Sequence, residues 1–352
     1  MTLFDSDFAP RERPRWSRRQ RVGGALIGVA LASAATFAVA PSPYVIEQPG
    51  PVYDTIGSVT VDGSDVALIT ISGTESYETT GSLDMLTVSI VGNPEQPLSW
   101  LEAGWAWFQP HHALLPMDAI FPPGQTAEQQ EEENQAQMVN SQQEAVAAAL
   151  TDLGYTLGER VAVAGLAKDA AATGLLEAGD IIVSANGIAV KTVAELKSQV
   201  NARSGAAVEL RIERDGATRA VSVVPSKASD GSWVLGIGAR IDYTFPFEVK
   251  IQLDNVGGPS AGMMFALGII AKLTPGGITG GAHWAGTGTI DAGGAVGPIG
   301  GIAQKMAGAR AAGADYMLAP LENCDEVTGN IPDGLTVFAV STLSQARSAV
   351  ET

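Results

Sequence analysis

A run of 19 residues without a charged side chain, from Val22 to Ala40, constrains this chain more than any other feature. As a helix the run would measure about 28 Å, close to the roughly 30 Å hydrocarbon core of a bilayer. It therefore predicts a membrane-spanning helix. The alternative is a cleaved signal peptide, because Ala38-Val39-Ala40 resembles a peptidase site. We favour an uncleaved anchor, since Pro41 directly after the cut would fit a peptidase poorly.

The charges before this run predict its orientation. Residues 1–40 carry six arginines against three acidic residues, and every arginine precedes the apolar run. These arginines are Arg11, Arg13, Arg15, Arg18, Arg19 and Arg21. Because arginine-rich flanks stay in the cytoplasm, we expect a single-pass protein of the cell membrane with its N-terminus inside. The body after residue 40 is then extracellular, and protease added to intact cells should degrade it.

Composition excludes several classes of protein. The chain has 352 residues with a net charge of -17, so we expect no nucleic-acid partner. With 45% hydrophobic residues it has enough apolar material for two domain cores. Its single cysteine, Cys324, excludes an intrachain disulfide and a cysteine-based zinc site. Three histidines without a His-Glu-x-x-His motif argue against a metalloprotease, so we expect neither a metal nor a cofactor.

The first part of the body predicts strands and one long helix. A Pro-rich connector, residues 41–51, is followed by a hairpin over 57–72 with its turn at 62–63, and by a strand over 83–91. Thr126-Ala-Glu-Gln129 is a capping-box pattern that should open a helix reaching Leu150. The predicted inner face of this helix consists of Met138, Gln142, Ala145, Val146 and Ala149.

Residues 98–108 concentrate aromatic side chains. Trp100, Trp105, Trp107 and Phe108 fall within this segment. Three interpretations stay open: the side chains rest at a lipid surface, line a substrate groove, or pack a helix onto the core.

Residues 160–225 form a separate unit that resembles a compact bacterial PDZ domain. The resemblance rests on Gly179-Asp-Ile-Ile182, a turn at Asn186-Gly187, a short helix over 193–202 and a hairpin turning at Asp215-Gly216. A PDZ groove accepts a peptide as an added strand and holds its terminal carboxylate with backbone N–H groups. Residues 153–155 and 160–162 are both candidates for that loop. The alternative is a scaffold without a ligand.

The sequence Asn255-Val-Gly-Gly-Pro-Ser-Ala-Gly262, followed by an apolar run to residue 271, carries a candidate nucleophile. Gly258 is suited to cap a helix and Pro259 to its first position, which places Ser260 in the first turn. Unpaired N–H groups there favour a developing anion, as acyl transfer requires. The alternative is a serine that only caps the helix.

A lysine 45 residues downstream is the candidate base. Lys305 lies on a predicted helix over 301–312, where its neighbours one turn away include no acidic residue. These neighbours are Gly301, Ile302, Gly308 and Ala309. Burial on this apolar stripe would lower the pKa of the amine and make it a usable base. The alternative is an exposed lysine that extends off the stripe.

Four ordered motifs together resemble the serine–lysine peptidase domain of the Lon family. They are Gly258-Pro-Ser-Ala-Gly262, Thr287-Gly-Thr-Ile290, Pro298-Ile-Gly-Gly-Ile-Ala-Gln-Lys305 and Ala319-Pro-Leu-Glu-Asn323. The resemblance implies Ser260 as nucleophile, Lys305 as general base and Thr287 as the hydroxyl that orients the lysine. It implies an oxyanion site at the backbone of Gly258 and Ala261. Many Lon enzymes carry an acid where this chain has Gly257, although Asp254 is near, so acid-dependent control of this loop is in doubt.

The order of segments resembles the membrane-anchored, PDZ-containing Lon-like proteases of Gram-positive bacteria. The implied fold is an α/β (α+β) Lon-type domain plus a PDZ domain and one transmembrane helix. The expected parts are a cytoplasmic tail (1–21), a transmembrane helix (22–40), an extracellular region that begins the Lon-type domain (41–150), the PDZ domain (151–232) and the catalytic domain (233–352). The pieces around 80–83 and 137–146 suggest that the PDZ unit is inserted into the protease domain.

The resulting functional prediction is an ATP-independent serine endopeptidase. It would cleave exported, unstructured polypeptides presented through the PDZ domain, with free C-termini as one means of recruitment, and its oligomeric state stays open. The chain has no Gly-x-x-x-x-Gly-Lys-[Ser/Thr] motif, which argues against ATP as a partner. A Ser–His–Asp hydrolase using His283 lacks an evident third member. The main alternative is an inactive surface PDZ scaffold.

Overall fold

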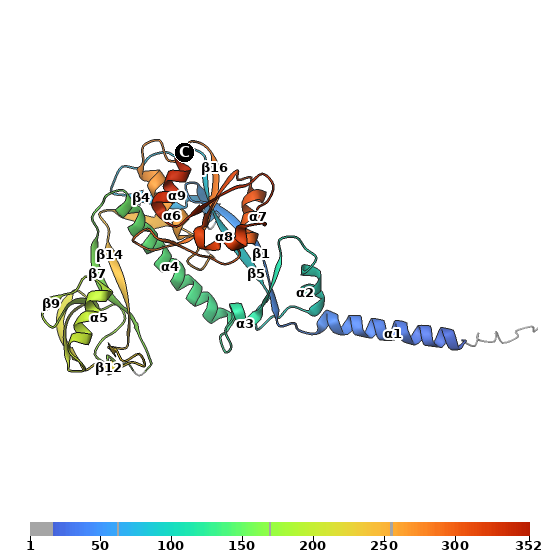
Figure 1. The fold of residues 1–352 in the computed structure, drawn as a ribbon, viewed down its shortest axis with the longest axis horizontal. Coiled ribbons are helices and arrows are strands. Elements are labelled where there is room, and N and C mark those ends of the chain that lie inside the picture. Colours follow the sequence, from blue (N-terminus) through green and yellow to red (C-terminus); the bar gives the residue numbers. More distant parts are fainter. Residues whose placement is uncertain (1–16, 62, 169, 254–255) are drawn as a thin grey trace, which may run out of the picture. The chain divides into compact units, whose positions relative to one another are not determined.

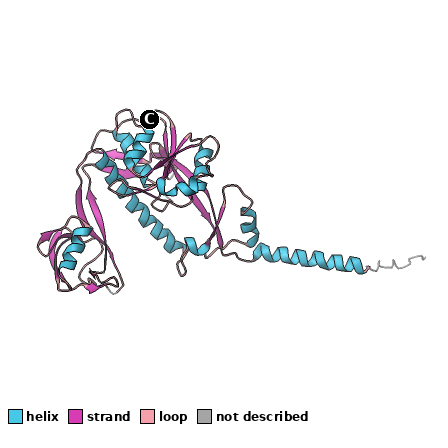
Figure 2. Ribbon diagram, in the orientation of Figure 1, coloured by secondary structure: helices cyan, strands magenta, loops and turns pink. Residues whose placement is uncertain are grey.

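The computed structural model describes residues 17–61, 63–168, 170–253 and 256–352. Contacts divide the chain into two compact units (Figure 1). The first contains the residues up to Pro49 and Val88–Glu131, and the second contains Gly50–Thr87 and Glu132–Thr352. Helices and strands both occur throughout the chain, which confirms the predicted mixed α/β class (Figure 2).

The first unit carries the apolar helix. Its elements are α1 (Arg18–Val39), α2 (Trp100–Ala106), β6 (Ala113–Pro116) and α3 (Met117–Ile120), with the first half of β1 (Tyr44–Asp54), the end of β5 (Ser82–Val91) and the start of α4 (Ala127–Asp152). Ser17 caps α1 in a capping box with Gln20. In the described part of the chain, α1 is the one helix long and apolar enough to cross a membrane. A helix of this kind near the N-terminus also fits a signal sequence.

The described residues of the second unit form three hydrophobic clusters, and two of them cover the faces of a mixed sheet. The strands of this sheet follow the order β20-β19-β16-β5-β1, with β5, β16, β19 and β20 parallel. The first half of β1, which belongs to the first unit, pairs with β6 of that unit. The further elements of the sheet region are β16 (His283–Gly286), β19 (Tyr316–Pro320), β20 (Thr336–Val340), α6 (Gly262–Leu273), α7 (Ile302–Ala312), η1 (Leu321–Asn323), α8 (Cys324–Val327) and α9 (Leu343–Val350). The same part of the chain also contains separate two-stranded sheets. They pair β2 (Ser58–Val61) with β3 (Ser64–Ala67), β4 (Ile69–Ser72) with β15 (Glu248–Ile251), and β17 (Thr289–Ile290) with β18 (Val296–Gly297).

Alternating side chains bury both faces of this sheet. On β16, Trp284 joins the cluster that contains α6 and α9, whereas Ala285 joins the cluster that contains α7. On β19, Leu318 faces the first cluster and Met317 the second. The strand period of two thus places helices on both sides. As a result, α6 and α7 approach the sheet from opposite faces.

Most predicted elements of this region occur, and the strand at 83–91 appears as β5. The hairpin is shorter than predicted, because β2 and β3 cover only 58–67 and residues 69–72 form β4, which pairs with β15 instead. Asp62 of the predicted turn lies outside the described residues. Thr126 and Gln129 form the predicted reciprocal capping bonds, at 3.2 and 3.1 Å. On α4, Met138, Ala145, Val146 and Ala149 are buried as predicted, while Gln142 is only half-buried.

The PDZ unit has a sheet and core of its own. Its strands are β7 (Gly158–Leu166), β8 (Ile181–Ala185), β9 (Ile188–Ala189), β10 (Val208–Arg214), β11 (Ala217–Val223), β12 (Ser226–Lys227), β13 (Trp233–Val234) and β14 (Ile237–Thr244), and its helix is α5 (Val193–Ala202). The main sheet has the order β11-β10-β8-β7-β14. Both predicted turns occur, with positive φ at Asn186 and Asp215, as two-residue hairpins require.

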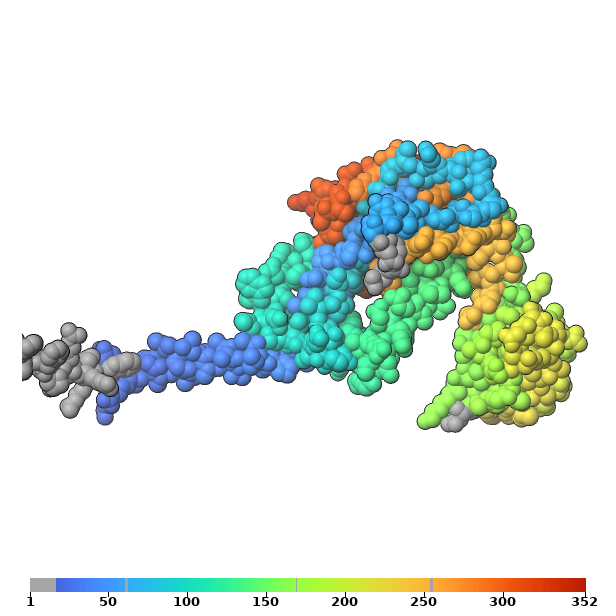
Figure 3. All heavy atoms as spheres, turned by 180° about the vertical axis from the view of Figure 1, so that it is seen from behind, coloured from blue at the N-terminus to red at the C-terminus, as the bar shows by residue number. Residues whose placement is uncertain are grey.

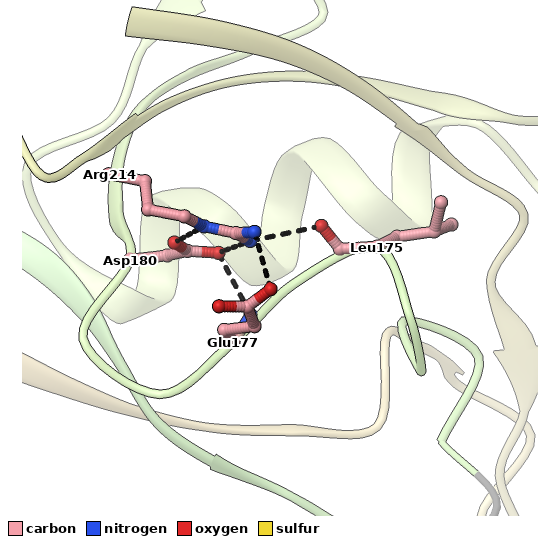
Figure 4. Close-up of polar contacts among 4 residues, drawn as sticks. All are labelled: Leu175, Glu177, Asp180 and Arg214. Carbon is pink, nitrogen blue, oxygen red and sulfur yellow. Dashed lines mark hydrogen bonds and ion pairs between the residues drawn. The ribbon is translucent and has the colours of Figure 1, made fainter. Parts of the chain in front are cut away.

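A buried ion pair fixes the turn before β8 onto β10 (Figure 4). Arg214 Nε and Nη2 each lie 2.6 Å from an oxygen of the buried Asp180 carboxylate. Arg214 also bonds Glu177 at 2.6 Å and the Leu175 carbonyl at 3.2 Å. The guanidinium thus holds the pKa of Asp180 below its usual value.

Segments on both sides of the PDZ unit share one core. Residues of α4, before the unit, and of α6 and α9, after it, lie in the same hydrophobic cluster. β4 pairs with β15, although the two strands lie on opposite sides of the PDZ unit in the sequence. The PDZ unit therefore interrupts, in the chain order, the segments that build this cluster.

The structure argues against both predicted carboxylate loops. Residues 160–162 lie in β7, whose two edges pair with β14 and β8, so this strand has no open edge for a ligand. Residues 153–155 directly follow α4, where Leu153 packs on the cluster that contains α6 and α9. The Tyr155 N–H donates to the Leu150 carbonyl at 2.9 Å. Neither segment belongs to an open PDZ groove.

Candidate active site

Ser260 and Lys305 come from opposite faces of the sheet and meet beyond the carboxyl end of β16. Lys305 Nζ lies 3.0 Å from Ser260 Oγ. It lies at the same distance from Oγ1 of Thr287, the residue that directly follows β16. The structure thus brings together all three side chains that the sequence predicted for catalysis.

The lysine and the threonine of this cluster are buried. Lys305 is 2% exposed and Thr287 is fully buried, whereas Ser260 is half-buried. Lys305 lies on α7 beside the buried residues Gln304 and Met306. This confirms the prediction of a lysine on a buried stripe rather than one that extends into solvent. A nucleophile open to a substrate beside a shielded amine suits acyl transfer.

The Thr287 hydroxyl connects the serine to the lysine by donating one hydrogen bond and accepting another. Its Oγ1 accepts from Lys305 Nζ and donates to the Ser260 carbonyl at 3.0 Å. The same carbonyl accepts the Gly288 N–H at 2.8 Å. Two donors from the segment after β16 therefore fix the main chain of the nucleophile.

These two bonds explain why α6 begins later than predicted. The sequence placed the cap at Gly258 and Ser260 in the first turn, but α6 begins at Gly262 with Ala261 as N-cap. The Ser260 carbonyl is bonded by Thr287 and Gly288, so residues 258–260 form a bend and turn rather than a helix. Gly258 has a φ of 84°, in the left-handed region that favours glycine.

The two predicted oxyanion donors differ in their present contacts. The Gly258 N–H donates to the Asn134 carbonyl at 2.8 Å, so it would have to leave that partner to bind an oxyanion. In the described residues the Ala261 N–H has no hydrogen-bond acceptor. Asp254, the acid predicted near this loop, lies outside the described residues.

The sequence suggested that residues 137–146 belong to the Lon-type domain, but it did not predict that α4 bonds the serine loop. Ser141 Oγ donates to the Pro259 carbonyl at 3.0 Å, and Asn134 accepts from Gly258. Glu144, whose pKa is raised mainly by burial, accepts the Ala292 N–H at 2.6 Å.

Asn323, from the fourth motif, holds the segment that leads into α7. Its Oδ1 accepts the Ile299 N–H at 3.0 Å, and its Nδ2 donates to the Ile299 carbonyl at 2.9 Å. Asn323 is buried, and its two hydrogen bonds take the place of bonds to water for the N–H and carbonyl groups of Ile299. It positions the start of the helix that carries Lys305.

His283 does not take part in this cluster. Its Nε2 lies 2.6 Å from the Asp84 carboxylate, on the neighbouring strand β5. Burial is the main cause that raises the pKa of Asp84. Among the residues that the structure describes, Ser260 Oγ bonds Lys305 and no histidine. Over the same residues, no group of three or more His, Cys, Asp or Glu side chains could hold a metal ion.

Comparison with protein families matches both parts of the second unit. Residues 254–350 match the Lon protease (S16) C-terminal proteolytic domain, and residues 132–224 match the PDZ domain. The fold and site therefore define a Lon-type peptidase domain. The chain combines this domain with a PDZ domain and an N-terminal apolar helix, which confirms the predicted combination.

The curated relatives extend far beyond the matched region. Lon protease 1 of Bacillus subtilis (strain 168) is 28% identical over 141 residues, covering 38% of this chain and 17% of the relative. Lon protease of Buchnera aphidicola subsp. Schizaphis graminum (strain Sg) is 29% identical over 133 residues, covering 36% of this chain and 16% of the relative. The chain thus spans about a sixth of these relatives.

Solved structures similar to this chain include PDZ domains. The PDZ domain of an SdrC-like protein from Listeria innocua is 23% identical, with a TM-score of 0.22, and covers 23% of this chain and 92% of that one. A solution structure from Geobacillus thermodenitrificans is 26% identical, with a TM-score of 0.21, and covers 22% of this chain and 94% of that one.

Proposed function

We propose that the chain is an ATP-independent, membrane-anchored serine endopeptidase that uses a Ser260–Lys305 dyad. The contact between Lys305 Nζ and Ser260 Oγ, at 3.0 Å and with a buried lysine, carries this proposal. A buried lysine disfavours its charged form, and the neutral amine can accept the serine proton.

The proposed reaction begins with attack of Ser260 Oγ on a peptide carbonyl carbon. The hydroxyl proton passes to Lys305 Nζ, and the carbonyl oxygen becomes an oxyanion that backbone N–H groups near the start of α6 stabilise. The C–N bond then breaks, and Lys305 returns the proton to the leaving amine. Water, deprotonated by the same lysine, hydrolyses the acyl-enzyme and restores Ser260.

The location is part of the proposal. Arg18, Arg19 and Arg21 occupy the first turn of α1, which favours a cytoplasmic N-terminus and an extracellular catalytic domain. Protease added to intact cells should then degrade the catalytic domain. A catalytic domain that survives until the cells are lysed would contradict this orientation.

We further propose that polypeptide substrates dock beside β14 of the PDZ unit. Among the described strands, β14 lies at the end of its sheet, which leaves one edge for an added strand. The carbonyls of Leu235 and Gly236 accept the N–H groups of Ala172 and Ala167, at 3.0 and 2.8 Å. Because peptide bonds are trans, the next two N–H groups point the opposite way, as carboxylate binding requires.

A serine-directed activity probe tests the catalytic part of the proposal. Purified full chain in detergent is incubated with the probe without ATP, and the modified residue is identified by mass spectrometry. Covalent labelling of Ser260, lost in Ser260→Ala and Lys305→Ala, is the expected result. Labelling of another serine, or only in the presence of ATP, would contradict it. No labelling at all, with an intact fold, would favour the inactive PDZ scaffold.

A further inference from the structure

The short helix α2 exposes an unusual concentration of aromatic side chains. Trp105, Trp107 and Phe108 are 69%, 74% and 82% exposed, and Leu101 is also exposed. The opposite face of α2 packs against the protein, because Ala106 lies in a buried cluster with Ile46 and Leu98. The exposed aromatic residues are therefore not the core-facing side of the helix, which removes one of the three interpretations.

Backbone hydrogen bonds tie α2 directly to the end of α1. The Trp100 N–H donates to the Ala40 carbonyl at 3.2 Å, and the Ser42 N–H donates to the Leu98 carbonyl at 2.7 Å. The Trp100 ring also makes an edge contact with Tyr44, at 6.0 Å between centroids. Because Ala40 directly follows α1, the start of α2 has to lie at the level where α1 ends.

The helix α1 itself has no protein cover. None of its described residues is buried, and Figure 3 shows them as an uncovered rod of blue spheres. The proposed function places α1 across the bilayer, so its last residue lies at the membrane–water interface. Tryptophan is favoured at this depth, since its ring is mostly apolar and its indole N–H can still reach water.

The lack of basic residues around α2 favours lipid chains, rather than anionic headgroups, as the contact of its exposed aromatic side chains. From Val22 to Glu159 the sequence contains neither lysine nor arginine. Contact with the membrane therefore depends on apolar burial and not on attraction to acidic lipids.

We propose that α2 and the following turn lie in the outer membrane interface, with Trp105, Trp107 and Phe108 inserted among the lipids. This inference rests on the proposed membrane anchor, because α1 supplies the level of the interface. It makes the first unit a two-point membrane contact, with one spanning helix and one interfacial helix. The interaction should be insensitive to salt and to the fraction of anionic lipid.

Spin labels on the full chain in phosphatidylcholine nanodiscs test this inference. In a Cys324→Ser background, a nitroxide is attached at Phe108→Cys, and its collisions with oxygen and with a water-soluble nickel complex are compared. We expect high oxygen and low nickel access, unchanged when anionic lipid is added. Ile188→Cys, at an exposed position of the PDZ unit, is the aqueous control, and Leu31→Cys on α1 reports the anchor.

The outcomes separate this inference from the proposed anchor. Aqueous values at Phe108→Cys with lipid values at Leu31→Cys would overturn the interfacial helix and leave the anchor in place. Aqueous values at both positions would contradict both. Low access to oxygen and nickel together at Phe108→Cys would show a protein contact, such as a second copy or a bound substrate, and would also overturn the inference.

Discussion

The Thr287 hydroxyl bonds both the proposed base and the main chain of the proposed nucleophile. Thr287→Val keeps the shape of the side chain but removes both bonds. We expect it to lower kcat about ten- to a hundredfold, which corresponds to about 1.4–2.7 kcal/mol of transition-state stabilisation. Thr287→Ser, which keeps the hydroxyl, should retain most activity. Steady-state peptide hydrolysis measures the effect, and a loss confined to KM would argue against an orienting role.

A second prediction at this scale concerns Asn323. Asn323→Ala removes both partners of the partly buried Ile299 N–H and carbonyl, at a cost of up to about 1–3 kcal/mol. Because Ile299 precedes α7, we expect kcat to fall more than KM rises. The matched control is Asn330→Ala, since Asn330 is exposed and donates one bond to the Glu326 carbonyl. Equal effects of the two substitutions on kcat would show that Asn323 does not position the helix of Lys305.

At the scale of single elements, the Asp180–Arg214 pair makes the PDZ unit sensitive to acid. The pKa of Asp180 is lowered, chiefly by its bond to Arg214, so the pair stabilises the fold above the unfolded-state pKa of about 3.9. This stability is lost as the pH falls through the lower, folded-state pKa. At neutral pH, Arg214→Gln should therefore reduce hydrogen-exchange protection in β8 and β10.

Arg160→Gln is the control for this pair. Arg160 lies 3.7 Å from Glu213 with both side chains exposed, so its loss should change protection little. The difference between Arg214→Gln and the wild type should shrink as the pH falls below about 3.9, where the unfolded state takes up its proton first, and should be lost at the lower folded-state pKa of Asp180. A difference that persists unchanged in acid would show that Arg214 acts through contacts other than its charge.

Local patterns in the sequence predicted most elements correctly, but not where they meet. The capping box at Thr126, the hairpin turns of the PDZ unit and the buried stripe of α7 depend on neighbouring residues, so they could be inferred from the chain. The later start of α6 could not. It depends on bonds to the Ser260 carbonyl from a segment 27 residues away. The support from Ser141 to Pro259 spans 118 residues, which no periodic pattern encodes.

At the scale of the whole molecule, we expect the PDZ unit to recruit protein substrates and the Ser260–Lys305 site to cleave them. Deletion of 160–225 should impair cleavage of proteins more than cleavage of short peptides, but it also removes most of the strand that pairs with β14. Gly236→Ala is a sharper variant, because its Cβ would lie 2.7 Å from Ala170 Cβ and distort the turn before β14. We expect a higher KM for an unstructured protein substrate and unchanged kinetics on a short peptide.

The control for this variant is Gly231→Ala. Gly231 also has a positive φ, but a Cβ there would meet no atom within 4 Å. It should therefore share the backbone strain and leave protein cleavage closer to the wild type. Parallel losses on protein and peptide substrates in Gly236→Ala would show that the PDZ unit supports the fold rather than recruiting substrate.

The most direct test of the Ser260–Lys305 dyad is peptide hydrolysis by the purified full chain across pH, without ATP. Wild-type activity should rise with pH as Lys305 loses its proton, with a midpoint below the ordinary lysine pKa of about 10.4. Ser260→Ala, Lys305→Ala and the double variant should lose similar activity, because the two residues act as a unit. Lys305→Arg should also be inactive, since a guanidinium cannot act as the base. A Lys305→Arg variant with turnover near that of the wild type would contradict the dyad.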